Sequence, residues 1–196
     1  MENDRMSEIV HSYLKESLDC ARTIAEDTSI IEKIVFAARI SIDSIKSGGK
    51  IIFMGNGGSA ADSQHLATEL VSRYKVDRRA ISALSLTVDS SVLTAIANDY
   101  EFERVFSRQI QAMARSGDIV VGISTSGNSM NVINGLKEAK KLGCKTISFT
   151  GIDGGNITEV SDLIINAPSS NTPVIQQSHI TFGHAICDLI ENEMAQ

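Results

Sequence analysis

Short apolar runs alternate with longer helical segments along most of the chain after residue 50. The runs cover residues 51–54, 81–86, 119–123, 146–150 and 163–165. They lack the polar alternation of a half-exposed strand, so we expect each to be buried on both faces, as in a parallel sheet. Strands that alternate with helices place helices on both sides of such a sheet. The pattern therefore predicts an α/β fold, a three-layer αβα sandwich with a parallel five-stranded sheet.

Both ends of the chain are predicted to be helical. Residues 6–27 and 29–47 carry apolar positions at three- and four-residue steps, and Ser47-Gly48-Gly49 is a stop signal. Pro173 suits the first turn of a last helix over 175–194. We expect a single domain over 1–196, with a helical extension (1–48) and an α/β core that includes the last helix (49–196). The extension has an apolar face that one protomer does not cover, which favours a homo-oligomer; the alternative is packing on its own sheet.

Composition excludes several classes of function. The 196 residues are 42% hydrophobic and 21% charged, with a formal net charge of −6. That charge gives no general attraction to nucleic acid, and the one dense basic stretch, 73–79, is short and interrupted. No segment has the length and apolarity of a signal peptide or a membrane span. Cys20, Cys144 and Cys187 are too far apart for metal spacing and are expected to be reduced and mostly buried. We expect a cytoplasmic protein that binds neither nucleic acid nor membrane.

Two loops rich in serine and glycine each follow a predicted strand and open a helix. They are Gly55-Asn56-Gly57-Gly58-Ser59 and Ser124-Thr125-Ser126-Gly127-Asn128-Ser129. Such a loop directs backbone N–H groups and the positive end of a helix dipole at one point, and hydroxyls add further donors. Helix capping would explain one or two of the hydroxyls in the second loop but not four. Neither loop has the signature of a nucleotide P-loop or of a dinucleotide-binding turn. The loops therefore favour a phosphorylated small molecule.

Candidate acid–base residues lie on two predicted helices. His65, Glu69 and Arg73 are spaced by four and would share one helix face, as an acid–base pair or as metal ligands. The alternative is a wet polar face with a Glu69–Arg73 ion pair. On the last helix, His184 lies in an apolar neighbourhood on one stripe with Gln176, either as a hydrogen-bonded core residue or as a proton-transfer group. Residues 97–100 are expected to form a third loop, whose Asn98 and Asp99 either cap the next helix or reach sugar hydroxyls.

Taken together, these segments resemble the sugar isomerase (SIS) domain family and, within it, the phosphoheptose isomerases. The likeness rests on Gly55–Ser59, His65-x-x-x-Glu69-x-x-x-Arg73-Tyr74, Asn98-Asp99, the 122–129 segment, the 150–155 segment, and Gln176 with His184 eight residues later. It is strongest from residue 55 to residue 194. The resemblance implies a flavodoxin- or Rossmann-like sheet, N-terminal helices used in oligomer packing, and a homotetramer. The segment Thr172–Gln177 carries less charge than the family pattern, so the resemblance says less about the sugar end of the site and the precise substrate.

The resemblance also implies a reaction and a set of residues. The reaction is aldose–ketose isomerisation of sedoheptulose 7-phosphate to D-glycero-D-manno-heptose 7-phosphate through an enediol, for bacterial lipopolysaccharide or capsule. Glu69 is the implied base and His184 its acid–base partner. The implied substrate-binding residues are Asn56, Gly57, Gly58, Ser59, Glu69, Arg73, Asn98, Asp99, Ser124, Thr125, Ser126, Ser129 and Gln176. Some relatives bind Zn²⁺ through residues that match His65, Glu69, Gln176 and His184, so zinc, one per subunit, is the candidate cofactor.

One relative of a different class competes with the enzyme. Residues 92–99 also resemble a non-catalytic SIS-domain regulator that binds the bacterial replication initiator protein. The resemblance implies that such binders have lost the catalytic carboxylate and histidine of the enzymes, whereas this chain keeps Glu69 and His184. The retained pair favours the enzyme. A sugar-phosphate sensor without turnover would need the same pocket.

Overall fold

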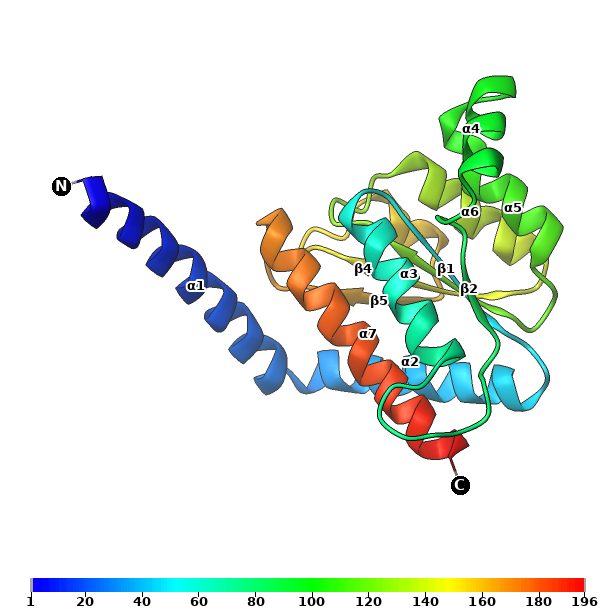
Figure 1. Cartoon of the computed structure of the whole chain (residues 1–196), viewed down its shortest axis with the longest axis horizontal. Coiled ribbons are helices and arrows are strands. Elements are labelled where there is room, and N and C mark those ends of the chain that lie inside the picture. Colours follow the sequence, from blue (N-terminus) through cyan, green and yellow to red (C-terminus); the bar gives the residue numbers. More distant parts are fainter. Residues whose placement is uncertain (1, 196) are drawn as a thin grey trace.

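The structure is a computed structural model that describes residues 2–195, and a five-stranded sheet lies at its centre (Figure 1). The strands are β1 (Ile51–Gly55), β2 (Ala83–Ser85), β3 (Ile119–Ile123), β4 (Lys145–Thr150) and β5 (Leu163–Asn166). They lie in the order β2-β1-β3-β4-β5, and every neighbouring pair is parallel. The helices are α1 (Glu2–Glu26), α2 (Thr28–Lys46), α3 (Gly58–Val71), α4 (Ser90–Asp99), α5 (Val105–Met113), α6 (Met130–Lys141) and α7 (Thr172–Met194), with 3₁₀ turns η1 (Phe102–Arg104) and η2 (Asn156–Val160). The predicted three-layer fold is confirmed.

Alternate residues of each central strand enter two separate cores. Ile51 and Phe53 of β1 pack with α2, α3 and α7, whereas Ile52 and Met54 pack with α5 and α6. Every residue of β1 and β3 is buried, as expected for strands covered on both faces. The three cysteines are buried free thiols. Among the described residues, no helix combines the length and apolarity needed to span a membrane.

The edge strand β2 is shorter than the predicted run over 81–86. Its N-terminal neighbour Ile81 donates its backbone N–H to the carbonyl of Leu70 at 3.1 Å, at the end of α3. That bond holds the chain to the helix, so regular pairing with β1 begins only at Ala83. The strand therefore starts later because the preceding backbone has a tertiary partner.

The two N-terminal helices have different positions, and this corrects the expectation that both lie outside the core. The side chain of Asp27 caps α2 by accepting hydrogen bonds from the N–H groups of Ser29 and Ile30. The apolar face of α2 then packs onto the sheet, with Ile34 and Ala38 buried. In contrast, α1 projects from the body of the protein (Figure 1). Along it, a stripe of large apolar side chains is exposed: Met6, Ile9, Val10, Leu14 and Leu18.

The order in which the chain adds strands to the parallel sheet changes side between β1 and β3. From β1 the chain continues to β2 on one side, and from β3 it continues to β4 on the other. Gly55 pairs with Ile123 at the carboxyl ends of these two strands, so the two serine- and glycine-rich loops leave the sheet side by side. Ligands of open α/β sheets bind at such a switch point. The fold therefore brings the two predicted anion loops to one place.

Candidate active site

Three of the predicted residues form one cluster. His65 and Glu69 lie one turn apart on α3, and His184 lies on α7, which runs alongside α3 (Figure 1). The Nε2 atoms of His65 and His184 are 2.9 Å apart, and His65 Nε2 is 3.1 Å from Glu69 Oε1. One nitrogen or oxygen atom from each residue lies within 4.8 Å of the other two. The predicted shared face of His65 and Glu69 is confirmed, and α7 supplies the third group.

The environment of the cluster favours neutral imidazole on α7. Burial lowers the pKa of His184, the adjacent His65 lowers it further, and Glu69 opposes both effects. The ring of Tyr74 stacks on His184, with centroids 5.6 Å apart and an angle of 29° between the planes. The Glu69 side chain is only 17% exposed, against 50% for His65. A shielded carboxylate beside an imidazole held by a stacked ring can transfer protons near neutral pH.

The same cluster fits a divalent metal. Two imidazole nitrogens and one carboxylate oxygen that face one another are a common protein ligand set for zinc, with further positions left for another ligand. The fourth predicted ligand, Gln176 of α7, lies against the first turn of α3, where a Cβ atom on Gly58 would overlap its side-chain amide. Glycine at position 58 therefore lets α7 approach the start of α3.

The second loop divides its hydroxyls between a cleft and its own structure. Thr125 and Ser126 line a cleft of ≈ 280 Å³. The opposite wall consists of residues 151–154, Ser169, Ser170, Thr172 and Ile175. Ser124 is buried and donates its hydroxyl to Ser129 Oγ at 3.0 Å. Ser129 is the N-cap residue of α6 but makes no side-chain capping hydrogen bond. Two predicted hydroxyls thus face a cleft, and two brace the loop.

Close backbone contact fixes the position of that loop. Gly127 has φ +66°, and a Cβ atom there would overlap the carbonyl of Gly154. Asn128 crosses the same junction, because its side-chain oxygen accepts a hydrogen bond from Asn156 N at 3.0 Å. The 124–129 and 151–155 segments belong to two separate motifs in the sequence, but they pack directly against each other in the structure.

The first loop is held by a pair of amides. Asn56 and Asn131 exchange two hydrogen bonds of 2.8 Å, which connect the end of β1 to the first turn of α6. Gly57 is the N-cap of α3, with φ +56° and no side chain to cap it. Ser59 is buried in the first turn. These contacts orient the start of α3 toward the carboxyl end of the sheet.

Two expectations about the site differ from the structure. Helix α3 ends at Val71, so Arg73 lies beyond it and does not share the helical face of His65 and Glu69. The third loop is in fact the last turn of α4, which includes Asn98 and Asp99. Their side chains bond to each other at 2.9 Å and do not cap the following turn η1, whose N-cap residue is Glu101.

Comparisons with known proteins identify the family of this chain. The family model described as the SIS domain matches residues 12–151. The phosphoheptose isomerase of Aliarcobacter butzleri is 50% identical over 189 residues, which is 96% of this chain and 98% of that protein. The chain belongs to the phosphoheptose isomerase family of SIS-domain proteins. The resemblance read from the motifs is confirmed.

Solved phosphoheptose isomerases have the same fold over nearly their whole length. The enzyme from Neisseria gonorrhoeae superimposes with a TM-score of 0.89 at 41% identity, covering 95% of this chain and 99% of that one. The enzyme from Francisella tularensis gives 0.91 at 30% identity, covering 95% and 98%. The phosphoheptose isomerase fold therefore extends beyond the motif region to the N-terminal helices.

Several residues of the site were not found from the sequence. Asn131 holds Asn56, and no loop or helix pattern marks it. Asn128 and Tyr74 lie inside the quoted motifs, but no role was predicted for either of them. Glu191 left a signal, because it follows Ile190 on the buried face of α7, four residues after the buried Cys187. A carboxylate on an apolar helix face indicates a buried partner.

Proposed function

We propose that this chain is a phosphoheptose isomerase that interconverts sedoheptulose 7-phosphate and D-glycero-D-manno-heptose 7-phosphate. The observation that carries the proposal is the His65–Glu69–His184 cluster, built on two packed helices in a chain of this family. The carboxylate of Glu69 and the imidazole of His184 have atoms within 4.8 Å of each other, and such groups can move protons between adjacent carbons and their oxygens. The two loops at the switch point supply neutral donors for a phosphorylated substrate.

In the forward reaction, Glu69 accepts a proton from C1 of the ketose while the C2 carbonyl oxygen gains a proton. The product of this step is a 1,2-enediol. Glu69 then returns its proton to C2, and the O1 hydroxyl loses a proton as the C1 aldehyde forms. His184 serves the oxygen-linked transfers, because its lowered pKa favours a neutral ring that can accept a proton and pass it on. No atom is gained or lost, and no redox partner is needed.

The remaining predicted residues would hold the substrate along its length. Ser124, Thr125, Ser126 and Ser129 bind the phosphate and the nearest hydroxyl. The sugar chain lies against a second group of residues, namely Asn56, Gly57, Gly58, Ser59, Arg73, Asn98, Asp99 and Gln176. The cleft beside Thr125 and Ser126 and the glycine-rich start of α3 support this arrangement.

Zinc is the proposed cofactor, one ion per subunit. His65, Glu69 and His184 would hold it, with Gln176 as the fourth ligand, and the ligand set of the described residues fits that ion. When bound, it would polarise the substrate oxygens as a Lewis acid. A carboxylate bound tightly to a metal is a poorer base, so we propose that the ion tunes the site while Glu69 carries the proton.

The exposed apolar stripe of α1 supports a homotetramer. Its residues recur at helical steps. The middle of α1 contacts α7 and its N-cap residue, because Gln177 donates a hydrogen bond to Tyr13 and Asn171 donates one to Glu16. A stripe of this kind is expected to be covered by another subunit. We place the enzyme in the cytoplasm, where its product would supply activated heptose for lipopolysaccharide or capsule. The initiator-binding regulator is the less favoured alternative, because the paired carboxylate and imidazole are present.

The variant Glu69→Gln tests the role of the carboxylate. It keeps the shape of the side chain and removes the base, so turnover of sedoheptulose 7-phosphate should fall by at least about 100-fold. Calorimetry should show that sugar-phosphate binding is largely retained. The matched control is Glu193→Gln at the exposed end of α7, which should turn over normally. Wild-type turnover in Glu69→Gln would contradict the assignment of the base.

A further inference from the structure

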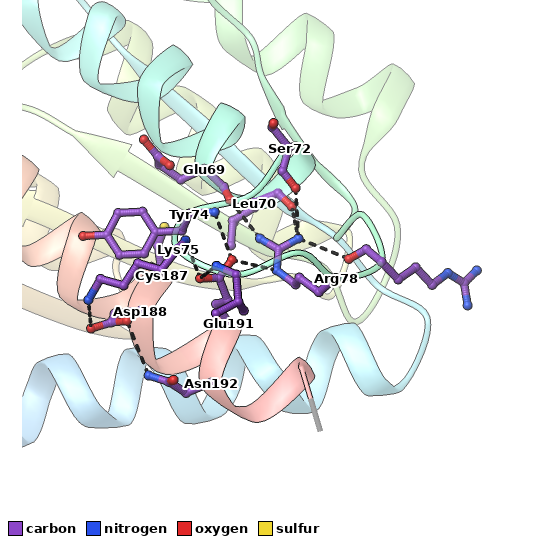
Figure 2. Close-up of polar contacts among 12 residues, drawn as sticks. Glu69, Leu70, Ser72, Tyr74, Lys75, Arg78, Cys187, Asp188, Glu191 and Asn192 are labelled. Atoms are coloured by element: carbon purple, nitrogen blue, oxygen red, sulfur yellow. Dashed lines mark hydrogen bonds and ion pairs between the residues drawn. The ribbon is translucent and has the colours of Figure 1, made fainter.

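A buried carboxylate on α7 holds the segment that follows α3. Glu191 is 2% exposed. Its Oε1 atom accepts a hydrogen bond from Tyr74 N at 2.9 Å, and its Oε2 atom accepts bonds from Lys75 N at 2.6 Å and Val76 N at 3.2 Å (Figure 2). Burial alone would raise the pKa of Glu191, but these N–H donors and the charge of Arg78 outweigh it and lower the pKa. The group is therefore an anion at neutral pH.

The guanidinium of Arg78 closes the end of α3. Its Nη2 donates to the carbonyl of Glu69 at 2.9 Å, and its Nη1 donates to the carbonyls of Leu70 at 2.9 Å and Ser72 at 3.3 Å (Figure 2). The last carbonyls of a helix have no partner inside the helix, and a cation there also complements the helix dipole. Arg78 Nε lies 3.2 Å from Glu191 Oε1, as an ion pair whose side chains are 2% and 3% exposed.

The two residues therefore connect the halves of the active site. Arg78 is bonded to the backbone of Glu69 itself. Glu191 lies seven residues after His184, on the same face of α7. The 72–78 segment, which both residues hold, carries Tyr74, whose ring stacks on His184. A shift of the 72–78 segment would change the position of Glu69 and the support of His184 together.

We propose that Arg78 and Glu191 are positioning residues that set the register between Glu69 on α3 and His184 on α7. The proposal rests on the proposed function for its catalytic consequence. Its consequence for metal affinity is independent of turnover, because Glu69 and His184 both belong to the candidate ligand set. Partners behind metal ligands typically change metal affinity by about 10- to 100-fold.

The double variant Arg78→Met, Glu191→Met separates positioning from folding. Removing one partner leaves an unpaired buried charge and destabilises the protein, whereas replacing both with apolar side chains is often tolerated. The double variant should stay folded but release the backbone of residues 74–76. The matched control is Lys46→Met, Glu193→Met, which removes an ion pair between α2 and α7 whose side chains are exposed.

Three measurements decide the proposal: the unfolding temperature, steady-state kinetics with sedoheptulose 7-phosphate, and titration with zinc alone against a fluorescent chelator. We expect kcat of the folded double variant to fall by at least about tenfold, with KM changed less, because residues 72–78 are not among those that line the cleft beside Thr125 and Ser126. The zinc dissociation constant should rise by at least about tenfold. The control should match the wild type in all three.

Each outcome supports or overturns the proposal. A folded double variant with wild-type kcat and zinc affinity would show that the pair only stabilises the fold. If the double variant does not fold, Arg78→Lys replaces it, since lysine keeps a positive charge beside Glu191 but lacks the guanidinium fork that bonds to the carbonyls of Glu69, Leu70 and Ser72, and the same changes are expected. A wild type without turnover would contradict the proposed function, and the zinc titration would still decide the positioning role.

Discussion

A buried histidine on α7 makes the stability of this protein depend on pH. His179 is fully buried and lies near the rings of Phe149 and Phe182, with centroids 5.9 and 6.3 Å away. Burial lowers its pKa to about 4 from an ordinary value of 6.5, and the backbone of Thr150 offsets this only in part. We expect His179→Leu, which has a similar volume, to remove this dependence.

The sign and the size follow from proton linkage. Between pH 6.5 and 4 the unfolded chain binds a proton at this position and the folded chain does not, so stability falls as the pH falls. For the two pKa values above, the loss in the free energy of unfolding is about 2 kcal/mol at pH 5 and about 3 kcal/mol at pH 4. Above pH 7 the contribution vanishes.

Urea denaturation at pH 7.5 and pH 5, followed by circular dichroism at one protein concentration, measures this effect. Other groups also titrate in this range, so the relevant quantity is the difference between wild type and variant. The wild type should lose about 2 kcal/mol more than His179→Leu on acidification. Equal losses in the two proteins would refute the argument that burial keeps this ring neutral.

Two further predictions concern the phosphate loop and α1. Combined Ser124→Ala and Ser126→Ala substitution should raise KM by about tenfold or more, because Ser126 would lose a hydrogen bond to the charged phosphate, worth about 1.5–3 kcal/mol, and Ser124 would lose the bond to Ser129 that braces the loop; an unchanged KM in steady-state assays would count against the phosphate site. Ile9→Lys with Leu14→Lys should lower the assembly size measured by light scattering, since charges would interrupt the exposed stripe of α1; an unaltered mass would place the subunit contacts elsewhere.

Much of the fold could be predicted from local patterns. The runs without alternation correctly predicted parallel strands, which are fully buried in β1 and β3 but only partly buried in the edge strands β2 and β5. The small-residue loops correctly marked the carboxyl ends of β1 and β3. The position of α2 could not be predicted, because its periodicity shows an apolar stripe but not which surface covers it. Residues such as Ile34 fit a sheet and another subunit equally well.

The sequence predicted those site residues that are placed by their spacing on one helix. It failed where a residue distant in the sequence determines the local structure. His65 and Glu69 share a helix face because they are four residues apart. Arg73 has the same spacing from Glu69, yet α3 ends two residues before it, where the guanidinium of Arg78 takes the last carbonyls. No glycine or proline marks that end.

The most direct test of the account follows sedoheptulose 7-phosphate by NMR in D₂O with the purified protein, with added zinc and with chelator. The account predicts that D-glycero-D-manno-heptose 7-phosphate appears and that deuterium enters at C2, because Glu69 exchanges its proton with solvent before returning it. The comparison of zinc with chelator shows whether the metal is needed. No conversion under either metal condition would contradict the proposed isomerase.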